Sequence, residues 1–404
     1  MSRRLSLRGW GSSLGLTTGY LARAATQWFL LWFFAATAGP QGAGQFSLAM
    51  ALSAPVFIFS QLGMRNLYMS MRDRPGLSTF FNLRTILSLA AGGVVLTIVA
   101  IRSDIGASIV GPVIAIKFFD SLTDICVGAL HANGRTSRVT ASMYANAVGT
   151  TTGAGAVFYL TGDPISSLWA SAVASALVFA YFGIPVLRAY RTPTFGGLRA
   201  RLTESGVIAR SGLPLAVAEA ISTLLAYLPV LYLAETATQT EIGLFSTAMY
   251  VITFANLFYS STQQVWLARL AQEHRAGRLR AAAMPPLIAM AALGLLGAGA
   301  TFALLPPLLP VIYGPEFGLT HSQVAPLAIA VLMLAFSYAA NLLLLVLNRY
   351  TRQLYVAASA LGVSLVTAFI LWDHGSIWAA GVLVATAACA RAVGAVTALL
   401  RAES

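Results

Sequence analysis

The chain has 404 residues, of which 58% are hydrophobic and only 9% are charged, and its mean hydropathy is +0.76. An ordinary soluble domain carries about a quarter charged residues, so a single globular core with a normal polar surface is excluded. The formal charge of +12 comes from basic residues that are spread along the whole chain rather than clustered, which excludes a nucleic-acid-binding face.

Apolar runs recur from end to end, separated by charged or Gly/Pro-rich breaks. Each run has about 20 residues, the length at which a helix crosses the roughly 30 Å hydrocarbon core of a bilayer. The sequence therefore predicts an all-α polytopic membrane protein. We expect twelve transmembrane helices, over residues 14–37, 45–67, 81–101, 107–130, 140–161, 166–188, 213–234, 242–266, 284–304, 324–347, 354–372 and 377–399.

The placement of charge gives these helices an orientation. With the exceptions of Arg23, Arg102, Lys117 and Arg391, all 25 basic residues fall in the termini or near the even-numbered loops. Lys and Arg are retained on the cytoplasmic side of membrane proteins. The sequence therefore predicts a multi-pass protein of the bacterial inner membrane with both termini in the cytoplasm.

A short repeat predicts the domain organisation. GQFSLAM begins at Gly44 and GLFSTAM at Gly243, 199 residues apart (243 − 44), and five of the seven positions agree. Each segment begins the second helix of a six-helix set, after a short predicted outer loop. We expect two parallel, pseudo-symmetric six-helix bundles with a substrate space between them. Their predicted bounds are 1–188 and 212–404, with a cytoplasmic linker at 189–211.

Ionisable residues inside membrane spans are costly and usually functional. Lys117, Asp120 and Asp124 follow one another at i, i+3 and i+7, so they share one helix face, which we expect to line a cavity. Arg23 lies on the first span and Glu219 on the seventh, its counterpart in the second half. We predict that Arg23 and Lys117 bind the substrate and that the three carboxylates couple transport to an ion, with Asp124 favoured.

Each of these residues also has a purely structural interpretation. Lys117 and Asp120 can neutralise each other within the helix and only stabilise the fold. Arg391, a further candidate substrate-binding residue, can extend to the cytoplasmic interface and do nothing else. Tyr20 lies one turn before Arg23 and can stack on a sugar or pack between helices. No metal ligands are expected, since no spacing of His, Cys, Asp or Glu fits a metal site.

Several segments resemble one transporter family. The segments AATAGPQGAGQFSLAMAL, QLGMRNL and KFFDSLTDICVGALHANGRTSR in the first half, and SGLPLAVAEAISTLL, EIGLFSTAM and VIYGPEFG in the second, are similar to the polysaccharide transporters. These form the O-antigen and teichoic-acid export branch of the multidrug/oligosaccharidyl-lipid/polysaccharide (MOP) flippase superfamily. The resemblance covers nearly the whole chain.

The resemblance implies a flippase that moves an undecaprenyl-diphosphate-linked oligosaccharide from the cytoplasmic to the outer leaflet by alternating access. It implies no cofactor, although a proton or sodium gradient is a candidate energy source. The expected partners are the lipid-linked glycan, membrane lipids and envelope-assembly proteins such as a glycan polymerase. Nucleic acid is not expected.

Two other functions stay open at this stage. A cation-coupled multidrug antiporter of the same superfamily would share the fold. A membrane-embedded glycan polymerase or ligase would act on the same substrates, but such enzymes usually carry a large outer loop with catalytic Arg and His. The longest predicted outer loop, 305–323, holds only Glu316 and His321 as groups that titrate near or below neutral pH, so we expect no enzyme.

Overall fold

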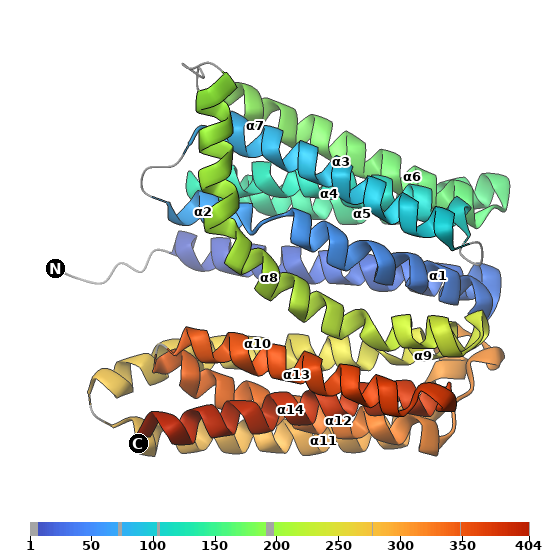
Figure 1. The fold of residues 1–404 in the computed structure, drawn as a ribbon, viewed down its shortest axis with the longest axis vertical. Helices are drawn as coiled ribbons and strands as arrows, with labels where there is room; N and C mark the ends of the chain where they lie inside the picture. The colour runs from blue at the N-terminus through green and yellow to red at the C-terminus, as the bar shows by residue number, and fades with distance from the viewer. Residues whose placement is uncertain are drawn as a thin grey trace. The chain divides into compact units, whose positions relative to one another are not determined.

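The computed structural model describes residues 7–71, 75–102, 106–190, 198–276, 278–347 and 349–403, which are helical over most of their length (Figure 1). The α-helices are α1 (Leu7–Ser60), α2 (Met64–Ser70), α3 (Leu77–Ile101), α4 (Ala107–Ala132), α5 (Thr136–Thr161), α6 (Pro164–Val178), α7 (Ile184–Ala189), α8 (Leu198–Thr236), α9 (Gln239–Ala248), α10 (Tyr250–Arg275), α11 (Leu279–Tyr313), α12 (His321–Val346), α13 (Tyr350–Ile370) and α14 (Ile377–Glu403). A π-helical turn, Phe179–Gly183, joins α6 to α7 without a break.

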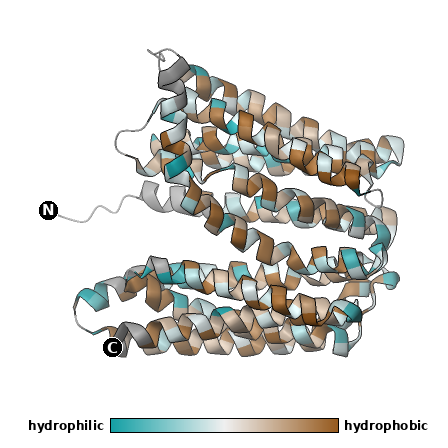
Figure 2. Ribbon diagram, viewed as in Figure 1, coloured by the Kyte–Doolittle hydropathy of each residue, from teal (hydrophilic) through white to brown (hydrophobic). Residues whose placement is uncertain are grey.

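Each of the twelve predicted spans is helical over most of its length, and the second, 45–67, crosses the turn at 61–63 between α1 and α2. Nine helical segments of the described residues are long and apolar enough to cross a membrane by composition alone. That count treats residues 18–70 as one segment and omits α4 and α5. Any long window of α4 includes Lys117, Asp120 and Asp124, and α5 is rich in Thr and Gly. The chain is a multi-pass membrane protein, and its apolar residues follow the lengths of the helices (Figure 2).

The predicted outer loop between the first two spans is a kink instead of a loop. Helix continues from Leu7 to Ser60 except at Gly39, whose backbone has φ 64° and ψ −166°. A positive φ of this kind is accessible to glycine at little cost, and Pro40 follows directly. Gly39 therefore separates two helices, and the Gly-Pro pair turns the chain between the first two spans with a single non-helical residue.

The chain divides into two compact units, and the first unit is made of two stretches of sequence, as is the second. The first unit contains Met1–Thr37 and Leu52–Ala220, and the second contains Ala38–Ala51 and Ile221–Ser404. The predicted domain bounds of 188 and 212 stay a prediction. Within the predicted linker at 189–211, residues 191–197 lie outside the described residues, and α8 begins at Leu198.

In the first unit, α4 is the central helix and packs against α2, α3, α5 and α6. One end of this helix lies in an apolar core with Met64, Phe80 and Leu130 at its centre. In the second unit, α12 is central and packs against α10, α11 and α14, while α13 packs on α14. Each unit thus surrounds one buried helix with others, and the buried helix of the first unit is the one that carries the predicted charged residues.

Candidate functional site

The site is built around α4 in the first unit, where the helical spacing of Asp120 and Asp124 places both carboxylates on one side. Arg65 on α2 donates from Nη1 to Oδ1 of Asp124 at 3.1 Å. Arg84 on α3 donates from Nη2 to Oδ2 of the same residue at 2.9 Å. Both oxygens of Asp124 are therefore engaged by arginines, which compensate for the water that this carboxylate lacks within a membrane.

Arg84 is the most enclosed charge in this cluster, with a side chain that is 0% exposed. Its Nε donates to the carbonyl oxygen of Ser121 at 3.1 Å, and its Nη1 donates to the carbonyl oxygen of Gln61 at 2.7 Å. A planar guanidinium presents its donors in a rigid fork, so three acceptors from two sequence-distant segments fix it in place. Arg84 thereby ties α3 and the end of α1 to α4.

The structure corrects the expectation for Arg84. The charge pattern predicts a cytoplasmic residue near an even-numbered loop, yet Arg84 lies within α3 and is buried. The available signal was its position three residues inside the predicted span 81–101. The pairing with Asp124 explains why a charge is tolerated there, and distance between helices is not readable from one sequence.

Arg65 was also counted among the loop charges, and it joins the site through Tyr20. Its Nη2 donates to the Tyr20 hydroxyl at 2.8 Å, and its guanidinium carbon lies 5.9 Å from the centre of the Tyr20 ring. Gly128 on α4 makes room for it, because a Cβ at that position would lie 3.0 Å from Cγ of Arg65. Tyr20 thus contacts a cation of the site, and its predicted role in stacking on a sugar stays a prediction.

Asp120 is held more loosely than Asp124. Its Oδ2 lies 3.9 Å from Nη2 of Arg23, whose side chain is 44% exposed. Asn146 on α5 donates from Nδ2 to Oδ1 of Asp120 at 3.1 Å and also lies 3.3 Å from Oγ of Ser175 on α6. The ion pair of Asp120 among the described residues is thus with Arg23 rather than with Lys117, which lies within electrostatic range of both.

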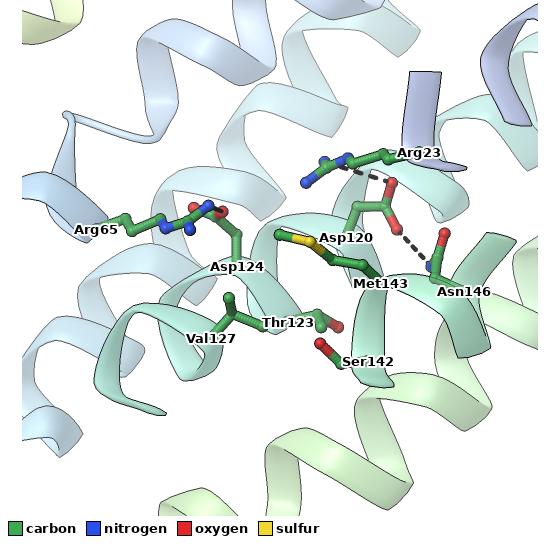
Figure 3. A pocket seen from close by; sticks show the side chains of 9 residues that line it. All are labelled: Arg23, Arg65, Asp120, Thr123, Asp124, Val127, Ser142, Met143 and Asn146. Atoms are coloured by element: carbon green, nitrogen blue, oxygen red, sulfur yellow. Dashed lines mark hydrogen bonds and ion pairs between the residues drawn. The ribbon is translucent and has the colours of Figure 1, made fainter. Parts of the chain in front are cut away.

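A cavity of about 30 Å³ opens between these side chains, which is room for about two water molecules. Figure 3 shows Arg23 and Arg65 pointing toward Asp120 and Asp124, with Asn146 beside Asp120. The lining residues come from α1, α2, α4 and α5, and they are Arg23, Arg65, Asp120, Thr123, Asp124, Val127, Ser142, Met143 and Asn146.

The remaining predicted residues fall into two groups. Glu219 on α8 belongs to the first unit and lies within electrostatic range of Arg84 and Asp124. Arg391 on α14 belongs to the second unit, where its charge acts on Tyr338. The structure therefore brings six of the seven predicted site residues into one unit, adds Arg65 and Arg84, and places Arg391 in the other.

The balance of charge decides what this cluster can bind. Arg23, Arg65, Arg84 and Lys117 supply four cations against the carboxylates of Asp120, Asp124 and Glu219. Arg84 is wholly enclosed, whereas Arg23 is partly exposed beside the cavity. An excess of cations with free surface favours an anion, and guanidinium groups match the geometry of phosphate oxygens.

No family model matches the sequence, and no curated protein matches it. Solved structures do match. A Lipid II flippase, MurJ, in an inward closed conformation superposes with a TM-score of 0.75 at 12% identity, over 96% of this chain and 87% of that one. The chain has the fold of the MOP transporters.

Two further MOP structures match over nearly the full length of the chain. An outward-facing MATE-family multidrug resistance transporter has a TM-score of 0.60 at 14% identity, over 97% of this chain and 95% of that one. A MOP superfamily transporter from Pyrococcus furiosus, for which a reverse polarity of the binding pocket is described, has a TM-score of 0.62 at 15% identity. The match covers 97% of this chain and 93% of that one. These neighbours have the two-bundle, twelve-helix architecture that the sequence predicts.

Proposed function

We propose that this protein is a flippase that moves a polyprenyl-diphosphate-linked oligosaccharide from the cytoplasmic to the outer leaflet by alternating access. The observation that carries the proposal is the cationic cluster around the cavity of the first unit, with Arg23 partly exposed beside it. The lipid tail of such a substrate can stay in the bilayer, but its diphosphate must cross hydrocarbon. Arginines on membrane-spanning helices supply the compensating charge that this crossing requires.

The way the arginines are held suits a transporter. Arg84 is fixed by two backbone carbonyls and Asp124, so it maintains the geometry of the cluster. Among the residues that the structure describes, the ion pair of Arg23 is with Asp120 at 3.9 Å, so an incoming diphosphate competes with a weak contact. A site that binds through one loosely paired arginine both captures an anion and releases it, which a cycle of transport needs.

The same exchange offers a means of coupling to an ion gradient. When a diphosphate binds Arg23, the carboxylate of Asp120 loses its ion pair with Arg23 and keeps its hydrogen bond from Asn146. A carboxylate that loses a cationic partner within a membrane gains affinity for a proton or a sodium ion. Asp120 is therefore the carboxylate through which we propose coupling, with Asp124 and Glu219 completing the acidic set.

A cation-coupled multidrug antiporter is the second candidate, because the neighbours include MATE-family transporters. Such a protein binds organic cations, for which a carboxylate free of arginines is the natural partner. Here Asp124 has two arginines and Asp120 has one. The charge of the cluster therefore favours the anionic lipid-linked substrate.

Purified protein in liposomes separates the two candidates. One set of vesicles carries a fluorescently labelled polyprenyl-diphosphate oligosaccharide in the inner leaflet, and its appearance outside is measured by a membrane-impermeant quencher. A second set contains a cationic dye, whose efflux is followed under an imposed proton or sodium gradient. We expect movement of the lipid-linked oligosaccharide and none of the dye. Efflux of the dye without movement of the lipid would replace the flippase by the antiporter.

A further inference from the structure

From Ile221 to the end of the chain, Arg391 is the one charged residue that falls within the predicted spans. This part of the chain has six acidic residues, and all of them lie at or beyond the ends of the spans: Glu235, Glu241, Glu273, Glu316, Asp373 and Glu403. In the first unit, Arg65 and Arg84 pair with Asp124. The spans of the second half hold no carboxylate that could pair with Arg391 in the same way.

The position of Arg391 keeps its charge within the membrane-spanning part of the helix. α14 runs from Ile377 to Glu403. Arg391 lies 14 residues after its first residue (391 − 377) and 12 before its last (403 − 391), or about 21 and 18 Å at about 1.5 Å per residue. Side chains of a helix lean toward its N-terminus, so Arg391 leans away from the end that is predicted to be cytoplasmic. This direction argues against the interpretation in which Arg391 only extends to the cytoplasmic interface.

α12 and α14 pack side by side in one register. A Cβ on Gly381 would lie 3.1 Å from Cβ of Pro326, and Ala395 belongs to the same apolar cluster as Ala340. Both pairs are 55 residues apart in the sequence (381 − 326 and 395 − 340), which is the constant offset of two helices that run in the same direction. Arg391, between Gly381 and Ala395, is therefore level with the middle of α12.

The middle of α12 is polar. Tyr338 lies within electrostatic range of Arg391. The hydroxyl oxygen of Ser337 and Oδ1 of Asn341 are buried and have no hydrogen-bond partner among the described residues. Arg391 makes no ion pair or hydrogen bond with the described part of the chain either. Buried polar groups are nearly always hydrogen-bonded in folded proteins, so a cation and two such side chains at one level of the unit indicate a ligand that supplies the missing partners.

The missing partner of a guanidinium within a membrane is an anion, because an unpaired cation there is costly. Phosphate oxygens match the planar fork of arginine. A serine hydroxyl can donate to a phosphate oxygen, and an amide oxygen can accept from a sugar hydroxyl. We propose that Arg391 is the centre of an anion-binding site in the second unit, with Ser337 and Asn341 beside it, and that the ligand is a sugar-linked phosphate.

The site gives the second unit its own cation for the transported lipid. The diphosphate needs a compensating charge for as long as it is within the hydrocarbon. Arg23 supplies that charge in the first unit, and Arg391 supplies it in the second. The identity of the lipid rests on the proposed function, whereas the evidence for the site lies in the second unit alone.

Chemical footprinting of the wild-type protein tests the site. Phenylglyoxal modifies accessible guanidinium groups, and mass spectrometry of the peptide that contains Arg391 measures the extent. One sample is the protein in phosphatidylcholine nanodiscs, and a second adds a water-soluble sugar diphosphate. A third has phosphatidylglycerol in the nanodisc in place of the sugar diphosphate. Arg275, an exposed residue of α10 in the same unit, is the internal control.

We expect the sugar diphosphate to slow modification of Arg391 about tenfold at about ten times its Kd, because about a tenth of the sites are then free. Modification of Arg275 should not change. Protection by phosphatidylglycerol and not by the sugar diphosphate would support a phosphate site and assign it to a membrane-lipid headgroup. Equal modification of Arg391 in all three samples would overturn the site. Absence of modification in every sample would overturn it too, since an enclosed guanidinium cannot exchange a ligand.

Substitutions test whether the bound anion is the transported lipid. Arg391→Gln should slow flipping of the labelled polyprenyl-diphosphate oligosaccharide about tenfold, as expected for loss of a hydrogen bond to a charged group, and Arg391→Lys should recover part of the rate. Arg275→Gln is the matched control and should flip as the wild type does. Flipping by folded Arg391→Gln at the wild-type rate would show that the anion bound there is not the transported lipid.

The footprint also separates this inference from the proposed function. If Arg391 is protected and Arg23→Ala flips normally, the site in the second unit stands and the role of Arg23 is wrong. If Arg23→Ala flips slowly and Arg391 is not protected, the flippase proposal stands and the assignment of Arg391 is wrong. The footprint is measured on the wild type, so it does not depend on the folding of any variant.

Discussion

Gly44 and Gly243, the first residues of the two repeated segments, pack backbone against backbone in the second unit. A Cβ on Gly44 would overlap with the carbonyl oxygen of Gln239, and a Cβ on Gly243 would overlap with that of Pro40. Each glycine thus faces the residue four positions before the other, so the contact is reciprocal. The two similar sequence segments thus meet in the folded protein, at one helix contact that needs glycine on both sides.

Substituting either glycine should weaken the fold. Gly44→Ala and Gly243→Ala each place a methyl group against a backbone carbonyl, which cannot rotate away as a side chain can. We expect destabilisation of about 1–3 kcal/mol or more, as for overpacking of a tight contact. Thermal unfolding of detergent-solubilised protein measures the effect. Gly299→Ala is the control, because no atom lies within 4 Å of a Cβ there, and equal behaviour of all three variants would contradict the close contact.

Removing Arg84 should destabilise the first unit strongly. The variant Arg84→Met leaves Asp124 with one arginine and leaves the carbonyl oxygens of Gln61 and Ser121 without this donor. Breaking a buried ion pair from one side costs about 3–5 kcal/mol. The unfolding temperature should fall in Arg84→Met and recover in part in Arg84→Met with Asp124→Asn, which removes the uncompensated charge. If Arg84→Met alone is as stable as the wild type, Arg84 does not hold the cluster together.

Coupling should depend on Asp120 more than on Asp124. The sequence favours Asp124, but both oxygens of this residue are engaged by arginines, whereas Asp120 is opposed by Arg23 at 3.9 Å. We expect Asp120→Asn to flip lipid at the same rate with and without an imposed proton or sodium gradient, while the wild type responds to one of them. Glu273→Gln, which removes a carboxylate from the surface pair with Arg278, should retain the response. A wild type that ignores both gradients would end the coupling proposal.

Asp163 gives the structure a measurable pH dependence outside the membrane-spanning segments. Its carboxylate accepts hydrogen bonds from the side chain and the backbone N–H of Ser166 and from the backbone N–H of Ile165, at the start of α6. These bonds lower the pKa of Asp163. A group with a lowered pKa in the folded state stabilises it at neutral pH, and this contribution is lost as the pH falls through the folded-state pKa.

The variant Asp163→Ala should therefore unfold at a slightly lower temperature than the wild type at pH 7. The difference should narrow as the pH is lowered from about 5. Asp163→Asn keeps an oxygen acceptor at the start of the helix without a titrating charge, so its difference from Asp163→Ala should not change with pH. A difference between Asp163→Ala and the wild type that is constant from neutral to acidic pH would contradict the role of the ionised carboxylate.

The sequence predicts the helices of this protein well because each span is a local property. A run of apolar residues forms a helix in a bilayer whatever its neighbours are, and all twelve predicted runs are helical over most of their length. The i, i+3, i+7 spacing likewise predicts that Asp120 and Asp124 share a face of α4. The kink at Gly39 was missed because Gly-Pro signals a turn in general, and only the surrounding structure decides that the helix resumes at once.

The partners of the charged residues were not predictable, because they depend on which helices become neighbours. Arg65 and Arg84 lie 59 and 40 residues from Asp124 in the sequence, and nothing local pairs them with it. Lys117 and Asp120 are one turn apart, yet Asp120 pairs with Arg23 from α1. The cytoplasmic placement of the termini rests on the distribution of arginines and stays a prediction.

If Arg23 binds the diphosphate of a lipid-linked oligosaccharide, substitutions of this one residue should change the rate of flipping in liposomes. We predict that Arg23→Ala flips the labelled polyprenyl-diphosphate oligosaccharide at least about tenfold more slowly than the wild type, as expected for loss of a hydrogen bond to a charged group. Arg23→Lys should recover part of the rate, since lysine supplies the charge without the planar fork. Arg138→Ala, which removes an exposed cation from α5, should flip as the wild type does. Flipping by Arg23→Ala at the wild-type rate, with the variant fully folded, would show that Arg23 does not bind the diphosphate.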